Sequence, residues 1–147
     1  MKIEKNKSLK TLNTFGIEAS AEYFAEIRSV SEFQELLRDK NFSGGEKHIL
    51  GGGSNILLTG DLSGLVIKNA IPGIAVAYED ESEVIVRAGA GGSWHDLVMW
   101  CVDRNYAGLE NLALIPGATG AAPVQNIGAY GVEQQDAFHE LEAVGID

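Results

Sequence analysis

Residues 50–58 of the chain read LGGGSNILL, a glycine-rich turn between two apolar runs. Consecutive glycines permit a positive φ and let the backbone approach a ligand without interference from a Cβ atom. Successive N–H groups in such a turn form a nest that binds anions, and Ser54 and Asn55 add side-chain donors. The turn contains no Lys or Arg, so a phosphate bound there would be held by backbone dipoles. A tight turn between strands is the alternative, and the stretch alone leaves both open.

The same stretch differs from two other phosphate-binding motifs. The third glycine of a G-x-G-x-x-G dinucleotide fingerprint would fall at Ile56, and we expect a strand where that motif requires a helix. The Gly-Lys-[Ser/Thr] of a P-loop occurs nowhere in the sequence.

A second glycine-rich segment, Gly89–Gly92, lies where a predicted strand meets a predicted helix. A helix N-terminus at this position would favour an anion. A turn that lets Trp94 pack into the core is the preferred interpretation, because G-x-G-x-x-G again fails, this time at Trp94.

The third segment, from Pro116 to Gly131, combines glycine and alanine with isolated polar residues. Small uncharged residues give a flat surface on which a large planar ligand can lie, and Gln125 and Asn126 offer directional hydrogen bonds to ring heteroatoms. Close packing of helices through small residues is the alternative. We expect the amides to be buried, and buried amides need partners, which argues for the ligand.

The pattern of apolar residues predicts an alternation of strands and helices. Ser29 and Ser93 are expected to cap helices, the first running to about Lys40. The second helix has an apolar stripe that comprises Trp94, Leu97, Val98, Cys101 and Val102. Strands are predicted at Glu22–Ile27, from His48 to Leu50, at Ile74–Tyr78, at Val84–Ala88 and at Phe138–Ile146. Because the last of these stops inside an apolar run, we expect a truncated chain with an exposed sheet edge that favours self-association.

Composition narrows the function classes. The chain has 147 residues, with 11 basic and 21 acidic side chains and a formal charge of -10. That charge disfavours nucleic acid and anionic membranes as partners. With one cysteine, no apolar leader at the N-terminus and no run long enough to span a bilayer, we expect a cytoplasmic protein. The scattered histidines predict no metal site, and Cys101 is expected to be a core thiol.

Read in order, the segments NTFG from Asn13, LGGGSNILL from Leu50, GAGGSWHDLV from Gly89 and GLENLALIPGATGAAPVQNIGAYGVE from Gly108 resemble one family. It is the UDP-N-acetylenolpyruvoylglucosamine reductase family, also called UDP-N-acetylmuramate dehydrogenase. The resemblance implies an α+β fold, a two-lobed FAD-binding domain of the PCMH / vanillyl-alcohol-oxidase type. Residues 1–69 would form the first lobe with the pyrophosphate loop, and residues 70–147 an incomplete second lobe without the substrate domain.

The resemblance also implies the cofactor and its binding residues. Family members use NADPH to reduce bound FAD, which then reduces UDP-N-acetylglucosamine enolpyruvate to UDP-N-acetylmuramate for peptidoglycan synthesis. The implied cofactor-binding residues are Gly51, Gly52, Gly53, Ser54, Asn55, Pro116, Gly117, Ala121, Ala122, Gln125, Asn126, Ile127, Gly128 and Tyr130. Many relatives carry hydroxyl residues where this chain has Ala121 and Ala122, so contacts there are expected from backbone N–H groups.

The family's catalytic residues come from segments that this chain does not contain, so we assign no catalytic residue. The expected partners are the nucleotide-sugar substrate and NADPH, with no nucleic acid and no membrane. Two alternatives stay open: another FAD-dependent oxidoreductase of the same fold, for which the GGGSN loop also fits, and a non-catalytic nucleotide-binding module.

Overall fold

The computed structural model describes residues 1–146, which divide into two compact units. The first unit comprises Met1–Ile71 together with the described residues 144–146, and the second comprises Pro72–Ala143. From sequence we expected lobes at residues 1–69 and 70–147. In the structure, residues 144–146 belong to the first unit instead of the second. The interpretation of the two units as cofactor-binding lobes stays a prediction, because contacts within the chain define them and no ligand does.

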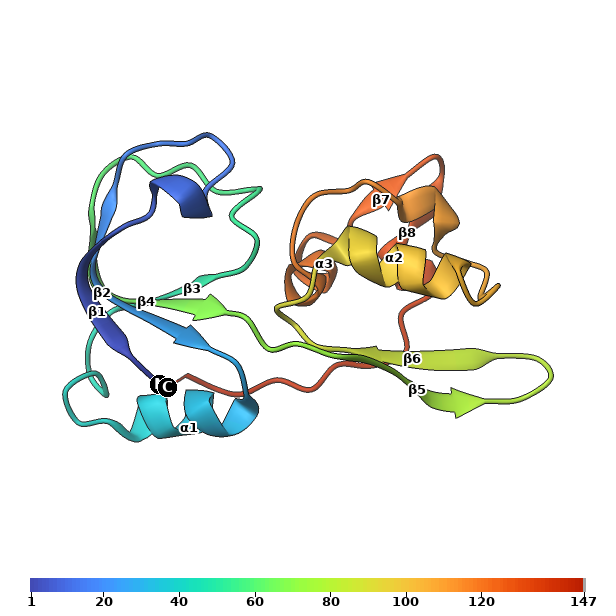
Figure 1. Cartoon of the computed structure of the whole chain (residues 1–147), viewed down its shortest axis with the longest axis horizontal. Helices are drawn as coiled ribbons and strands as arrows, with labels where there is room; N and C mark the ends of the chain where they lie inside the picture. Colours follow the sequence, from blue (N-terminus) through green and yellow to red (C-terminus); the bar gives the residue numbers. More distant parts are fainter. Residues whose placement is uncertain (147) are drawn as a thin grey trace. The chain divides into compact units, whose positions relative to one another are not determined.

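The first unit is built on a four-stranded sheet with the order β1-β2-β4-β3 (Figure 1). Its strands are β1 (Ile3–Ser8), β2 (Ser20–Ile27), β3 (Lys47–Leu50) and β4 (Leu62–Asn69). Strand β1 runs antiparallel to β2, whereas β4 runs parallel to both of its neighbours, β2 and β3. The parallel pairs bring the carboxyl ends of β2, β3 and β4 to the same edge of the sheet.

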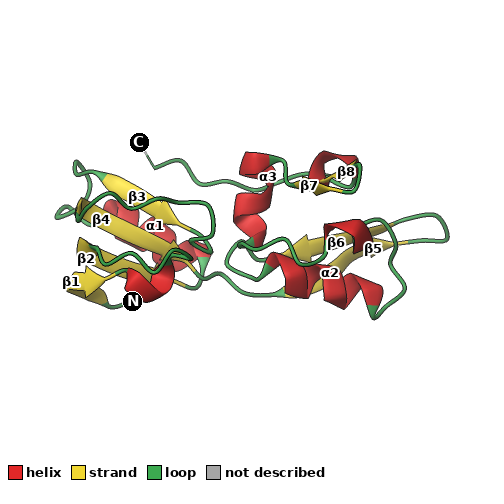
Figure 2. Ribbon diagram, turned by 90° about the horizontal axis from the view of Figure 1, so that it is seen from above, coloured by secondary structure: helices red, strands yellow, loops and turns green. Residues whose placement is uncertain are grey.

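Both faces of this sheet are covered, because successive side chains of a strand point to opposite faces. On β4, Val66 belongs to one buried cluster, while its neighbours Leu65 and Ile67 belong to another. Helix α1 (Val30–Arg38) lies against the second face (Figure 2) and buries Leu36 in the same cluster as Ile67. The helix begins where expected, since the Ser29 hydroxyl accepts a hydrogen bond of 3.1 Å from the amide of Glu32.

The second unit begins with a hairpin of β5 (Ile74–Glu79) and β6 (Val84–Ala88), which confirms the predicted pair of strands. Its turn is held by Asp80, whose Oδ1 accepts hydrogen bonds from the amides of Ser82 and Glu83. A hydrogen bond donated by the Tyr78 hydroxyl, together with these two, holds the pKa of the Asp80 carboxyl well below its ordinary value.

Helix α2 (Trp94–Val102) confirms the predicted amphipathic helix, and four residues of its apolar stripe are buried: Trp94, Leu97, Val98 and Cys101. Val102 was expected on the same stripe but is 40% exposed, because it lies at the last position of the helix. The rest of the unit consists of short elements, namely η2 (Glu110–Leu112), η3 (Thr119–Ala121), α3 (Ala122–Gln125), β7 (Gly128–Ala129), β8 (Val132–Glu133) and η4 (Gln134–Asp136).

Two predicted strands are wrong. The residues after the first glycine loop, from Ile56 to Asp61, form no regular secondary structure, since the chain buries Leu58 in the core of the first unit while Leu57 stays 68% exposed. Phe138–Ile146 is not a strand either. It pairs with no sheet edge; instead Val144 and Ile146 line a small apolar hollow of the first unit.

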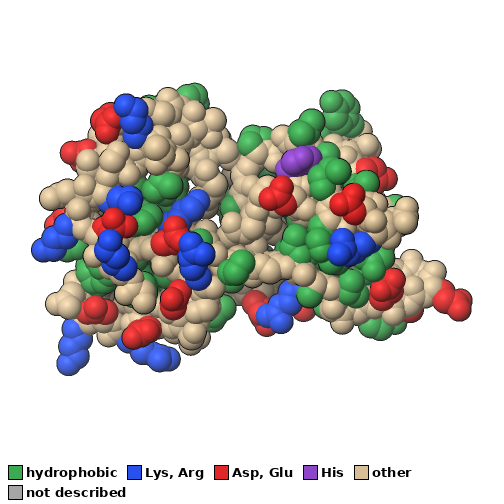
Figure 3. Space-filling view, in the orientation of Figure 1, with side chains coloured by type: hydrophobic (Ala, Val, Ile, Leu, Met, Phe, Trp, Pro, Cys, Tyr) green, Lys and Arg blue, Asp and Glu red, His purple; other side chains and the backbone are tan. Residues whose placement is uncertain are grey.

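Acidic and basic side chains are intermingled over the first unit on the face that Figure 3 shows. Within residues 1–146, the longest apolar helix is too short to cross a bilayer.

Candidate cofactor site

The Gly51–Asn55 loop follows directly on β3 and forms a series of bends. Gly53 has a φ of +71°, and a Cβ atom added to it would lie 1.9 Å from the carbonyl oxygen of Leu12. Both the left-handed backbone and the close approach exclude any other residue. Gly53 is therefore required for the loop to lie against the N-terminal segment, and not only for approach to a ligand. Ser54 beside it is half-buried, and Asn55 is exposed.

The N-terminal segment also holds the loop by a hydrogen bond. The amide of Thr14 donates to the carbonyl oxygen of Gly53 at 3.0 Å. This contact joins the Asn13–Gly16 motif to the glycine loop, two of the segments through which the chain resembles the reductase family. Phe15, the residue after Thr14 in this motif, is 68% exposed.

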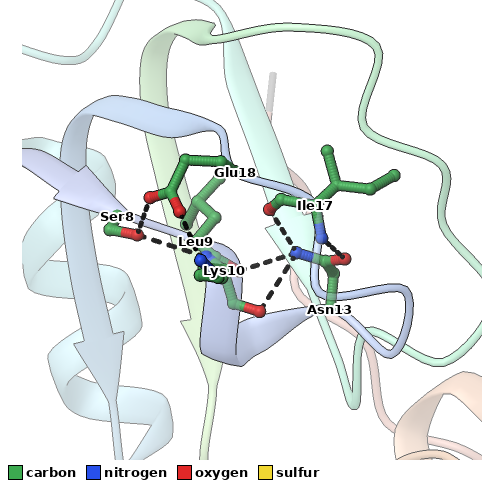
Figure 4. A network of polar contacts seen from close by, with 6 residues as sticks. All are labelled: Ser8, Leu9, Lys10, Asn13, Ile17 and Glu18. Atoms are coloured by element: carbon green, nitrogen blue, oxygen red, sulfur yellow. Dashed lines mark hydrogen bonds and ion pairs between the residues drawn. The ribbon is translucent and has the colours of Figure 1, made fainter.

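A buried asparagine fixes the conformation of this supporting segment (Figure 4). Asn13 is only 6% exposed. Its Nδ2 donates to the carbonyl oxygens of Leu9 at 2.9 Å, Ile17 at 3.0 Å and Lys10 at 3.4 Å, and its Oδ1 accepts from the amide of Ile17 at 2.9 Å. A carboxamide has both donors and acceptors, so it closes this turn as no apolar or charged residue of the same size could.

A lysine lies beside the loop, although the loop itself contains no basic residue. Lys68 of β4 pairs in register with Leu50 at the end of β3, and its ammonium group donates a hydrogen bond to the carbonyl oxygen of Gly51. Burial lowers the pKa of Lys68 below its ordinary value, and the negative charge of Glu26 opposes that shift. Sequence reasoning missed this cation because only the parallel pairing of β3 with β4 brings it to the loop.

The second and third glycine segments pack main chain against main chain. The amide of Thr119 donates to the carbonyl oxygen of Gly92 at 2.8 Å, and the amide of Gly120 donates to that of Ala90 at 2.9 Å. A Cβ atom on Gly120 would lie 2.5 Å from the Cβ of Ala90, so glycine is required for this approach. The preferred interpretation of Gly89–Gly92 as a turn that buries an indole is confirmed.

Trp94 itself is 2% exposed, and its Nε1 donates to the carbonyl oxygen of Leu112 at 2.9 Å. Its main-chain amide donates to Gly117, which has a φ of +134°. Pro116, one residue earlier, is exposed. The start of the third segment is thus anchored to the N-terminus of α2.

Two alanines of the third segment, Ala121 and Ala122, have no amide left for a ligand in this arrangement. The N–H of Ala121 donates to the carbonyl oxygen of Ala118, and the N–H of Ala122 donates to that of Thr119. Ala122 is moreover 3% exposed and belongs to the core around Trp94. Backbone contacts from these amides to a cofactor would require the loss of these internal bonds.

The two amide side chains of the segment lie at the surface, so the expectation that they are buried is wrong. Gln125 and Asn126 are both exposed. Asn126 ends α3 in the left-handed conformation, its Nδ2 donates to Glu133 Oε2 at 2.7 Å, and its Oδ1 accepts from the amide of Gln135 at 3.1 Å. Helix termination and the link to the β7–β8 hairpin explain an asparagine here.

Tyr130 lies at the tip of that hairpin. Tyr130 and Gly131 form its two-residue loop with φ values of +55° and +80°, as a type I′ turn requires. A bulky residue with positive φ is strained, and Tyr130 is also 89% exposed. Earlier in the same segment, Ile127 is half-buried and packs on the core of the unit, and Gly128 is the first residue of β7.

The most exposed apolar side chains lie in or near the predicted binding segments. Among residues 1–146, the five most exposed large hydrophobic side chains are Tyr130 at 89%, Val124 at 84%, Leu114 at 79%, and Phe15 and Leu57 at 68% each. Tyr130 and Val124 belong to the third glycine segment and Leu114 precedes it; Leu57 follows the first glycine loop, and Phe15 is next to Thr14, which donates to Gly53.

Two of the three histidines make structural contacts, and the cysteine is buried. His48 Nε2 lies 3.1 Å from the carbonyl oxygen of Ser63, and His95 Nδ1 accepts from the amide of Leu114 at 3.2 Å. Cys101 is 2% exposed, and burial raises the pKa of its thiol. Within the described part of the chain, no three His, Cys, Asp or Glu side chains gather as metal ligands would.

Comparison with known proteins agrees with this geometry. Residues 21–146 match the family model described as FAD binding domain, so the chain belongs to this family of FAD-binding domains. It is similar over its length to UDP-N-acetylenolpyruvoylglucosamine reductases. That of Flavobacterium johnsoniae is 48% identical over 147 residues, which are 100% of this chain and 43% of the relative. That of Amoebophilus asiaticus is 47% identical over 146 residues, 99% and 43% of the two chains.

Among solved structures, the chain resembles the UDP-N-acetylenolpyruvylglucosamine reductase (MurB) of Thermus caldophilus. The TM-score is 0.69 at 26% identity, over 92% of this chain and 46% of that one. The chain thus spans less than half the length of the relatives it matches. The family resemblance, the α+β fold and FAD as the cofactor, all expected from sequence, are confirmed.

Proposed function

We propose that this chain is the FAD-binding part of an enzyme that reduces UDP-N-acetylglucosamine enolpyruvate to UDP-N-acetylmuramate with NADPH. Its similarity over the whole length to reductases of that name favours this substrate over those of other flavoproteins with the same fold. The observation that carries the proposal is the support of the Gly51–Asn55 loop from two sides. One donor holds the carbonyl of Gly53 and another that of Gly51.

This support fits a diphosphate. A trans peptide group directs its N–H opposite to its C=O. Donors of the protein hold the carbonyls of Gly51 and Gly53. In each of these two peptide groups, the N–H of the next residue is therefore directed away from that donor. Each charge-assisted hydrogen bond to a phosphate contributes about 1.5–3 kcal/mol, so a few amides offset the unfavourable net charge of -10.

The third segment would contact the rest of the cofactor in this proposal. Exposed Tyr130, Val124 and Leu114 supply apolar surface for a planar ring system, and the exposed Gln125 can reach a ligand. The proposed binding residues remain those expected from sequence: Gly51, Gly52, Gly53, Ser54, Asn55, Pro116, Gly117, Ala121, Ala122, Gln125, Asn126, Ile127, Gly128 and Tyr130. Within this set, Ala121 and Ala122 act through small size, because their amides are bonded internally.

Held by the proposed loop and third-segment residues, FAD would supply hydride transfer between NADPH and the enolpyruvyl double bond. The described residues bind and orient the cofactor, and we assign none of them a proton transfer. We therefore expect no reduction of the enolpyruvyl substrate by this chain alone. We further infer that the enzyme works in the cytoplasm, since its products serve precursor synthesis for peptidoglycan. We propose that self-association uses a sheet edge such as β1 or β3 of the four-stranded sheet, because Phe138–Ile146 is not a strand.

A titration of the purified chain with FAD, FMN and riboflavin tests the proposal, with visible absorption and flavin fluorescence as readouts. Only FAD contains the diphosphate. We expect FAD to bind at least about tenfold more tightly than FMN, as one hydrogen bond of about 1.4 kcal/mol would give. Equal affinities for the three flavins, or no uptake of FAD, would contradict the proposal.

A further inference from the structure

We propose that Lys68 is a positioning residue for the diphosphate loop, holding the Gly51–Gly52 peptide so that the N–H of Gly52 is directed at the ligand. This inference rests on the proposed FAD site. It assigns a role to a side chain outside the glycine loop, on a different strand, which neither the loop motif nor the composition of the loop indicates.

The geometry begins with strand register. Lys68 on β4 pairs with Leu50, the last residue of β3. Its long side chain therefore starts level with the point where the loop begins, and its ammonium group donates to the carbonyl oxygen of the next residue, Gly51. Because the peptide group is planar and trans, this contact directs the N–H of Gly52 away from Lys68.

The surroundings of Lys68 explain why a lysine suits this position. The side chain is half-buried, and desolvation lowers its pKa. Glu26 of β2 pairs in register with Lys68 and favours the charged form. A partly desolvated ammonium group gains more from a carbonyl acceptor than an exposed one does. The loop thus has a fixed donor behind it.

The chain contains a matched control on the neighbouring strand β3, at the end opposite to the glycine loop. Lys47, the first residue of β3, also donates to a glycine carbonyl, that of Gly45, at 3.3 Å. That contact is exposed and lies away from the glycine loop. Replacement of either lysine by methionine removes one charge and one lysine–glycine hydrogen bond, so the two variants differ in the position and burial of the lost contact.

The experiment measures FAD affinity by calorimetry for the wild-type chain and for Lys68→Met, Lys68→Arg and Lys47→Met, with thermal unfolding of each. We expect Lys68→Met to weaken FAD binding about tenfold, the effect of one lost charge-assisted hydrogen bond. Lys68→Arg keeps a donor and should retain most of the affinity, and Lys47→Met should bind as the wild type does. Unchanged affinity in Lys68→Met, or an equal loss in Lys47→Met, would overturn the inference.

A second readout needs no ligand and separates this inference from the proposed function. In ¹⁵N spectra of the free chain, the amide of Gly52 should change its chemical shift in Lys68→Met and stay unchanged in Lys47→Met. If the wild type takes up no FAD, the proposed function fails, while an unchanged Gly52 amide in Lys68→Met sinks the positioning role. Should Lys68→Met not fold, Lys68→Leu, which also lacks both the charge and the donor, serves both measurements with the same expected losses.

Discussion

The amide of Thr14 donates a 3.0 Å hydrogen bond to the carbonyl oxygen of Gly53, and so connects the N-terminal turn to the glycine loop. Beside this contact, Gly53 comes so close to Leu12 that no Cβ atom fits. The conformation of the proposed diphosphate loop therefore depends on residues distant in sequence. Substitutions in the N-terminal turn should alter cofactor binding without touching the cofactor.

Gly53→Ala should destabilise the chain by about 2–5 kcal/mol. The left-handed conformation costs a residue with a Cβ atom about 1–2 kcal/mol, and the contact with Leu12 adds about 1–3 kcal/mol of overpacking. Gly16→Ala is the matched control, since Gly16 has a φ of +63° but open space around its Cβ position. It should show the conformational cost alone in urea unfolding. Equal losses for the two variants would show that the approach to Leu12 does not constrain the loop.

Asn13→Ala should cost about 2–4 kcal/mol and weaken FAD binding. The substitution removes the side-chain donor to the carbonyls of Leu9 and Ile17 and the acceptor of the Ile17 amide, at about 1–3 kcal/mol for each group left unsatisfied; the Leu9 carbonyl keeps the amide of Leu12 as a donor. Asn41→Ala is the control, because Asn41 makes its side-chain contact to Asp39 at the exposed surface and should change stability by less than about 1 kcal/mol. A stable Asn13→Ala variant with normal FAD affinity would contradict the supporting role of this turn.

The larger elements were predictable because their signals are local. Apolar periodicity and a capping serine are enough to locate α1 and α2, and alternation around an acidic turn is enough for the β5–β6 hairpin. Strand β1 has a charged sequence, IEKNKS, and forms only by pairing with β2, so nothing local indicated it. Phe138–Ile146 alternates as a strand does but has no sheet edge as a partner, and tertiary context overrides the pattern.

Tyr130→Asn should stabilise the free chain by about 0.5–1 kcal/mol. Asn-Gly is the preferred pair for the type I′ turn at this hairpin, whereas Tyr130 adopts a positive φ at a cost. The same change should weaken FAD binding by about 0.5–1.5 kcal/mol, because an exposed aromatic contact is removed. Thermal unfolding and FAD titration check the two effects. A gain in stability without loss of affinity would remove Tyr130 from the proposed site.

Cys101 should resist thiol reagents in the native state. Reaction requires the thiolate, and burial raises the pKa of this thiol, an effect that the nearby charge of Arg104 only partly opposes. At about pH 8 the thiolate fraction should therefore be smaller in the folded chain than in the unfolded one. A coloured disulfide reagent should react slowly in buffer and rapidly with one equivalent in urea. Prompt reaction of the folded chain would contradict its place in the core.

The sequence predicts the part of the candidate site that consists of main-chain amides, because clustered glycines mark such a loop. The loop at Gly51–Asn55 is recognisable from its sequence, but Lys68 reaches it only through the register of parallel strands. Asn126 is exposed and ends a helix, so its residue type alone did not reveal its role. Contacts that depend on pairing between distant strands have no local signature.

The most direct test is an FAD titration of the ¹⁵N-labelled chain, followed at the amide resonance of Gly52, whose N–H is directed away from Lys68 by the contact at the Gly51 carbonyl. We predict that this resonance shifts and that it saturates at the FAD concentration at which flavin absorbance reports binding. Flavin uptake that leaves the Gly52 amide unchanged would show that the cofactor is held elsewhere, and that the supported glycine loop is not its diphosphate site.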